Sequence, residues 1–257
     1  MIPIGICAQL SDLPDAQALG YDYVETPLDA LATLSDSYFD EFAAWCAGTG
    51  LKVLAVNRLL PADLPIVGPE VRAPELHMYL TRAFERCKRL NVRVVTLDAA
   101  AQRAVPEGCD YPLAWRQLGN FLRLIQPHAR ENRLTVAVEP LRKTDCNLLN
   151  LVSEATLMAG LLQLPNVGVA ANTGAMAMAA EPLSALAQTG AALCHIHLEH
   201  PLTRRMPREG DGEDYWKLMR TLKQAGYTGG VSVAYTKTAD FVSDARAALL
   251  CLRQAQH

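Results

Sequence analysis

The stretch Val136-Ala-Val-Glu-Pro-Leu-Arg-Lys-Thr-Asp-Cys-Asn-Leu-Leu-Asn150 contains a carboxylate at the end of an apolar, β-branched run. Pro140 stops the predicted strand directly after Glu139, because proline has no N–H to give to a ladder. A carboxylate at the end of a buried strand is costly unless it is paired, hydrogen-bonded or bound to a cation. From these residues alone, an ion pair with a neighbouring Arg or Lys and a functional site explain Glu139 equally well.

Short apolar runs alternate with longer amphipathic segments along the whole chain, a pattern that predicts eight strand–helix units. We expect strands at 2–6, 21–25, 51–56, 92–97, 134–138, 167–171, 192–198 and 230–235. We expect helices at 12–19, 35–48, 74–90, 111–131, 151–162, 182–188, 213–225 and 240–253. Continuous apolar strands, each followed by a helix, are typical of a parallel sheet covered on its outer face. Because no G-x-G-x-x-G follows the first strand, we predict an α/β chain with one domain, residues 1–257, folded as a (β/α)8 TIM barrel.

Composition narrows the class of partner. The formal net charge of −3 gives no electrostatic reason to expect a nucleic acid or an anionic membrane. No apolar run is long enough to span a bilayer, and the first residues lack the positive charge that begins a signal peptide. The 7 cysteines have no C-x-x-C spacing and suit a reducing compartment. We therefore expect a cytoplasmic protein whose partner is a small molecule.

Functional residues of a (β/α)8 barrel lie at the C-terminal ends of its strands. The positions at or just past those ends are Glu25, Asn57, Arg103, Glu139, Asn172, His197 and Ala234. Glu25 could hydrogen-bond a substrate, but an anchoring role is the favoured interpretation. His195 shares the face of His197 one layer deeper, and we expect it to pack inside the barrel.

Several motifs, spread over nearly the whole chain, occur in an order typical of one family. They are Gly20-Tyr-Asp-Tyr-Val-Glu25, Asn57-Arg-Leu-Leu-Pro61, Arg103-Ala-Val-Pro-Glu-Gly108, Val138-Glu-Pro-Leu141, Cys194-His-Ile-His197, Arg204-Arg-Met-Pro207 and Gly226-Tyr-Thr-Gly-Gly-Val-Ser-Val233. In these motifs the chain resembles the xylose isomerase-like TIM barrels, which are sugar isomerases and epimerases grouped with endonuclease IV. The resemblance implies a carbohydrate-like ligand and a homodimer or homotetramer. The nuclease branch relies on a three-metal cluster with many more ligands than 6 scattered histidines provide.

The resemblance also implies a metal site. In the family a divalent cation, usually Mn²⁺, Mg²⁺ or Co²⁺, is held by Glu, Asp, His and Glu after strands five to eight. Carried over, these positions are Glu139, Asn172, His197 and Ala234. Because hard divalent cations need several oxygen ligands, an amide and an alanine weaken the site. We expect a metal such as Mn²⁺, Mg²⁺ or Zn²⁺ to be absent or weakly bound, with an Arg or Lys neighbour balancing the charge of Glu139.

The family's reaction removes a proton from the carbon next to a carbonyl of a keto-sugar, polyol or hydroxy acid. Glu139 survives as a base for this step, and His197 with Arg204 or Arg205 could stabilise the oxyanion. The loss of the carboxylate at position 234 compromises a two-base epimerisation more than a one-base isomerisation. The alternative is a non-catalytic small-molecule-binding member of the family.

Five residues are the candidate ligand contacts: Asn57, Arg103, Asp145, Arg204 and Arg205. Asn57 could line the pocket or form an Asx-turn with its own loop. Asp145 matches a family acidic residue that contacts a substrate hydroxyl, and the alternative is a cap on the following helix. The arginines could hold hydroxyls, a phosphate or a carboxylate.

Overall fold

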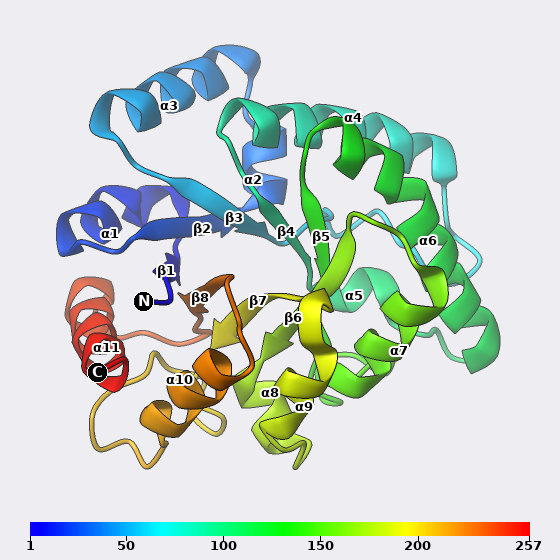
Figure 1. Ribbon diagram of the computed structural model, residues 1–257. Coiled ribbons are helices and arrows are strands. Elements are labelled where there is room, and N and C mark those ends of the chain that lie inside the picture. Colours follow the sequence, from blue (N-terminus) through cyan, green and yellow to red (C-terminus); the bar gives the residue numbers. More distant parts are fainter.

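The computed structural model describes residues 1–257, and its parallel strands form a closed barrel in the order β1 to β8. Figure 1 shows the strands at the centre and the helices around them. The strands are β1 (Ile4–Cys7), β2 (Tyr23–Pro27), β3 (Val53–Asn57), β4 (Val94–Leu97), β5 (Thr135–Val138), β6 (Val167–Asn172), β7 (Leu193–Leu198) and β8 (Gly230–Val233). The predicted (β/α)8 TIM barrel is therefore confirmed.

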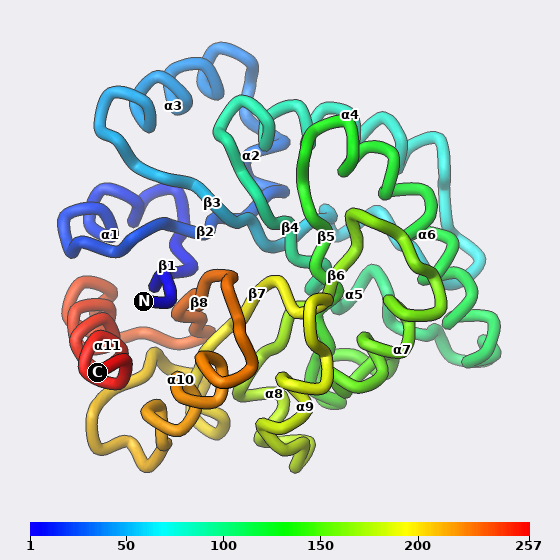
Figure 2. Tube along the Cα trace, in the orientation of Figure 1, coloured from blue at the N-terminus to red at the C-terminus, as the bar shows by residue number.

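The helices follow the chain around the barrel. They are α1 (Leu13–Leu19), α2 (Leu28–Thr33), α3 (Asp36–Thr49), α4 (Ala73–Arg89), α5 (Ala100–Arg103), α6 (Tyr111–Glu131), α7 (Val152–Leu162), α8 (Thr173–Met178), α9 (Ser184–Thr189), α10 (Tyr215–Gln224) and α11 (Phe241–Ala255). Figure 2 shows that this circuit brings α11 beside α1, where Gln256 accepts a hydrogen bond from the Ile2 amide at 2.9 Å. None of these helices has the length and apolarity needed to cross a membrane.

The main differences from the predicted elements lie at the C-terminal rim. The short helices α2, α5 and α8 have only four to six residues each, too few for a 3.6-residue periodicity to be recognised. Strand β2 begins at Tyr23 instead of Tyr21 and runs on to Pro27. Tyr21 precedes the strand and is held by its side chain instead, because its hydroxyl donates a hydrogen bond to the Ala245 carbonyl at 2.7 Å.

A packed aromatic ring from β2 lies against β1 and β8. Tyr23 points inward from β2, and its hydroxyl lies 2.9 Å from the Ser232 hydroxyl. A β carbon at Gly5 would lie 2.3 Å from the Tyr23 ring, and one at Gly230 would lie 2.4 Å from its hydroxyl oxygen. The two glycines therefore make the space that this ring fills.

Candidate active site

A cavity of about 550 Å³ opens at the C-terminal end of the barrel, where the functional residues were predicted. Every strand supplies a lining residue at or just past its end: Cys7, Pro27, Asn57, Asp98, Glu139, Asn172, His197 and Ala234. Loop residues add further acidic and basic groups: Asp12, Asp145, Glu199, Arg58 and Arg204. The cavity is polar and contains more carboxylates than cationic side chains.

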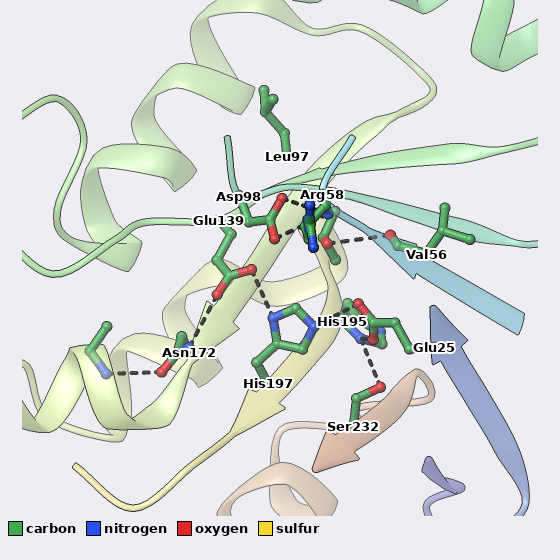
Figure 3. Close-up of polar contacts among 12 residues, drawn as sticks. Glu25, Val56, Arg58, Leu97, Asp98, Glu139, Asn172, His195, His197 and Ser232 are labelled. Atoms are coloured by element: carbon green, nitrogen blue, oxygen red, sulfur yellow. Dashed lines mark hydrogen bonds and ion pairs between the residues drawn. The ribbon is translucent and has the colours of Figure 1, made fainter. Parts of the chain in front are cut away.

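Figure 3 shows a chain of carboxylates and imidazoles, in which Glu139 and His197 line this cavity and Glu25 and His195 do not. His197 Nδ1 lies 2.8 Å from Glu139 Oε2, and His197 Nε2 lies 2.8 Å from Glu25 Oε1. The second oxygen of Glu25 lies 2.8 Å from His195 Nε2, and Asn172 donates to Glu139 Oε1 at 3.2 Å. His195 is buried one layer below His197, as predicted. Glu25 does not line the cavity, and it anchors the two histidines.

The electrostatics of this chain centre on His197. Burial lowers the pKa of its imidazole, but the charges of Glu139 and then Glu25 outweigh burial and raise the pKa well above 6.5. Burial raises the pKa of Glu25, but the charges of His197 and then His195 hold it well below 4.5. An imidazolium therefore lies between two carboxylates. The expectation that an Arg or Lys balances the Glu139 carboxylate is wrong, since His197 does so.

Asp98 is a cavity residue that the sequence prediction missed. It follows β4 directly, and its carboxylate accepts hydrogen bonds from the Arg58 amide at 2.9 and 3.2 Å. Burial and then the charge of Glu139 raise its pKa to about 6. The signal was present in the sequence, because Asp98 ends an apolar run in the same way that Glu139 does.

Arg103 does not reach the cavity, so the expected ligand contact is wrong. Its side chain is fully buried, and it donates to the Leu97 carbonyl at 3.0 Å and to the Glu139 carbonyl at 2.6 Å. The cause is α5, which turns residue 103 back beneath the rim. Arg103 therefore ties the ends of β4 and β5 together.

The other predicted ligand contacts divide into two groups. Asn57, Asp145 and Arg204 line the cavity, and the Arg204 guanidinium binds the Asp145 carboxylate at 2.5 Å. Arg205 lines a neighbouring cavity instead, and Arg204 before it has a left-handed backbone with φ 54°. The buried Asn57 Oδ1 has no hydrogen-bond partner, so the alternative of an Asx-turn is wrong. The residue that caps α7 is Leu151, so Asp145 does not act as its cap.

A buried ion pair supports the loops around the cavity. Arg142 Nη2 donates to Glu199 Oε1 at 2.6 Å, with only 9% and 8% of the two side chains exposed. Gly174 lies against this pair, because a β carbon there would be 2.7 Å from Arg142 Nη2 and 2.8 Å from Glu199 Cγ. The pair joins the loops that follow β5 and β7.

The residues that could hold a metal are largely engaged with one another. Cys7, Glu25 and His197 offer ligand atoms within 4.8 Å of one another, but burial and then the charge of Glu25 raise the pKa of the Cys7 thiol to about 12. Both nitrogens of His197 face carboxylates. Asn172 Oδ1 accepts from the Ala175 amide at 3.0 Å, and Ala234 has no side-chain donor. This set of donor groups differs from the ligands that the family uses for its metal, which are three carboxylates and a histidine.

The fold and the site define a TIM-barrel protein with an acid–imidazole cluster at the C-terminal rim. The sequence profile of the family described as xylose isomerase-like TIM barrel matches residues 13–255. The chain belongs to this family.

Solved structures with the same fold include several sugar epimerases. A 3-keto-D-glucoside 4-epimerase, YcjR, from E. coli has 19% identity and a TM-score of 0.86, with 99% of this chain and 100% of that chain covered. A D-psicose 3-epimerase with D-tagatose from Clostridium cellulolyticum H10 has 19% identity and a TM-score of 0.87, with both chains covered to 100%. The IOLI protein with a bound zinc atom has 18% identity and a TM-score of 0.74, with 99% and 96% covered. No curated protein sequence matches the chain.

Proposed function

We propose that the protein is a sugar isomerase that removes a proton from the carbon next to a carbonyl, with Glu139 as the base. Its substrate class is a keto-sugar or a related polyol or hydroxy acid. The observation that carries the proposal is the placement of Glu139, which lines the cavity while His197 and Asn172 fix both of its carboxylate oxygens. A base held in one orientation suits proton abstraction from a bound substrate.

The chemistry follows from the groups at the cavity floor. Glu139 takes the proton, the C–H electron pair forms the double bond of an enediol, and negative charge develops on the carbonyl oxygen. Asp98, with its pKa of about 6, is suited to donate a proton to that oxygen near neutral pH. The positive charge of His197 offsets the growing negative charge. Glu139 then returns its proton to the neighbouring carbon, while the hydroxyl on the first carbon gives its proton back to the Asp98 carboxylate and becomes the new carbonyl, which completes a one-base isomerisation.

The cavity walls support a carbohydrate as ligand. A volume of about 550 Å³ lies within the usual range for small-molecule sites. The unpartnered oxygen of Asn57 is an acceptor for a substrate hydroxyl, since a buried acceptor without a partner is costly. Asp145 and Arg204 offer a paired acceptor and donor at the cavity mouth. Ala234 leaves the wall beside β8 without a carboxylate, which favours isomerisation over a two-base epimerisation.

The proposed reaction uses no tightly bound metal. A divalent ion at the family's positions would have to displace the hydrogen bonds of His197 and Asn172, and it would find no ligand at Ala234. The donor set therefore does not fit the family's metal.

Deuterium exchange tests the proposal without knowledge of the natural product. The protein is incubated in D₂O with D-fructose, D-tagatose or D-psicose, and NMR follows replacement of the C–H next to the carbonyl. We expect exchange that persists in EDTA and falls by about 100-fold or more in Glu139→Gln. Glu41→Gln is the matched control, because Glu41 is exposed and makes no ion pair. Full exchange by Glu139→Gln would refute the role of Glu139, and loss of exchange in EDTA would refute the metal-free reaction.

The alternative of a non-catalytic sugar-binding protein has its own support. Both nitrogens of His197 are already bound within the protein, and two of the family's ligand positions carry Asn172 and Ala234. This alternative predicts binding of a sugar by calorimetry with no deuterium exchange in the wild-type protein. Exchange that depends on Glu139 excludes it.

A further inference from the structure

A second cavity, of about 530 Å³, lies beside the candidate active site. It is lined by eight residues from the loop after β7 and the segment after β8: His200, Leu202, Thr203, Arg205, Met206, Arg208, Asp211 and Lys237. A strip of backbone separates the two cavities, since the amides of Thr236 and Lys237 donate to the Arg204 carbonyl at 2.9 and 3.3 Å. Arg204 and Thr236 line the first cavity, whereas Arg205 and Lys237 line the second.

Three cationic side chains of this second cavity have no partner. Arg205, Arg208 and Lys237 are all exposed, and none forms an ion pair or a side-chain hydrogen bond. Arg204, at the same rim, differs from these three because its guanidinium forms an ion pair with Asp145. The donors of these three side chains are therefore free for a ligand.

The one carboxylate of the cavity is used within its own loop. Asp211 accepts hydrogen bonds from the amides of Arg208 at 3.0 Å and Glu213 at 3.1 Å, and from the Tyr215 hydroxyl at 2.7 Å. These bonds fix the loop. Asp211 keeps its single negative charge, so the three cations leave the cavity wall with an excess of positive charge.

The histidine of the cavity is likewise committed to the loop. His200 Nδ1 accepts from the amides of Leu202 at 3.2 Å and Thr203 at 3.1 Å, while Nε2 donates to the Asp211 carbonyl at 3.2 Å. Its side chain is buried, so it shapes the cavity wall and is not a free ligand group.

Charge therefore differs sharply between the two cavities. The first is lined by five carboxylates, from Asp12, Asp98, Glu139, Asp145 and Glu199, which outnumber the cationic side chains of Arg58, Arg204 and His197. The second presents three unpaired cations around a concave surface. Guanidinium groups bind phosphate and carboxylate oxygens through two parallel hydrogen bonds, and lysine adds a point charge.

We infer that the second cavity is a binding site for a small oxyanion, a phosphate or carboxylate group, held by Arg205, Arg208 and Lys237. The site goes beyond the proposed isomerisation and does not depend on it. The anion has one of two sources. It is either the charged end of a sugar ligand that extends past Arg204 or a separate inorganic anion.

Calorimetric titration with inorganic phosphate at low salt tests the site. We expect binding by the wild-type protein that is at least about tenfold weaker in the triple variant Arg205→Gln, Arg208→Gln, Lys237→Gln. Arg130→Gln is the control, since Arg130 is exposed on α6, lines neither cavity, and makes no ion pair. Sodium chloride should weaken binding, because exposed charges are screened over about 10 Å at 0.1 M salt. Absence of phosphate binding, or equal affinity in the triple variant, would overturn the inference.

A second titration distinguishes the two sources of the anion. D-Fructose 6-phosphate that binds more tightly than both inorganic phosphate and D-fructose, with the gain lost in the triple variant, supports a sugar ligand that spans both cavities. Equal affinities for D-fructose 6-phosphate and inorganic phosphate support a separate anion. Both results support the site, and neither requires turnover. Failure of deuterium exchange would refute the isomerase and leave this result intact.

Discussion

Gly174→Ala tests the packing around the ion pair that supports the cavity. The added β carbon would lie 2.7 Å from Arg142 Nη2, 2.8 Å from Glu199 Cγ and 3.1 Å from the Glu199 carbonyl oxygen. Optimal separations are about 3.5–4.0 Å, so all three approaches are repulsive. Either the start of α8 or the buried Arg142–Glu199 pair has to move.

The expected loss of stability is about 2 kcal/mol, within the range of about 1–3 kcal/mol for overpacking a buried site. It would be larger if the pair separated, because breaking a buried ion pair costs about 3–5 kcal/mol. At about 2–4 °C per kcal/mol for a chain of this size, Tm should fall by about 4–8 °C.

Urea unfolding followed by circular dichroism measures this loss, with Gly160→Ala as the matched control. Gly160 is also helical, in α7, and a β carbon there would meet no atom within 4 Å. The control should gain about 0.5–1 kcal/mol, since glycine destabilises a helix interior relative to alanine. Adding Glu199→Ala removes the Cγ atom, so the cost of Gly174→Ala should shrink in that background. A gain in stability by Gly174→Ala equal to that of the control would refute the reasoning.

Three further variants address the cluster and its cavity. Glu25→Gln should cost about 3–5 kcal/mol in urea unfolding at the pH where both charges exist. Because the pKa of Glu25 is held below 4.5 and that of His197 is raised above 6.5, this cost should be greatest between pH 4.5 and 6.5. It should shrink as pH rises through the folded-state pKa of His197 or falls through that of Glu25, and a constant cost would contradict the charged network. Asn172→Asp with Ala234→Glu restores two carboxylates, so saturating Mn²⁺ should stabilise this variant by about 2–3 kcal/mol in thermal unfolding and the wild type by less. No gain over the wild type would show that the positions are wrongly matched to the family's ligands. Asn57→Ala should weaken D-tagatose binding about tenfold in calorimetry with little effect on stability, because its oxygen has no partner within the protein.

The strand ends could be found from sequence, but their partners could not. Apolar runs that end in Glu139 and His197 place both residues at the rim without any knowledge of contacts. The carboxylate that holds the other side of His197 comes from Glu25, 172 positions away in the chain. Since pairing over such separations depends on barrel register, an Arg or Lys counterion was the reasonable but wrong expectation for Glu139.

Side-chain direction at the rim was the other limit of the sequence. Arg103 and Arg205 both follow strand ends, and this position in the sequence predicts a ligand contact for each of them. A four-residue helix carries the buried Arg103, and a residue with a left-handed backbone, Arg204, precedes Arg205, which lines the second cavity. Neither feature leaves a periodic pattern. Asp98, by contrast, could have been found by the rule that identified Glu139.

The ring of Tyr23 fills the space beside Gly5 and Gly230 inside the barrel, whereas the candidate active-site cavity opens at the C-terminal rim. A substrate that enters by this mouth and a product that leaves by it share one route, so the product has to leave before the next molecule binds. The loops that carry Asp145 and Arg204 at that mouth therefore affect both the entry of substrate and the release of product. A compound lodged there would block entry and exit together.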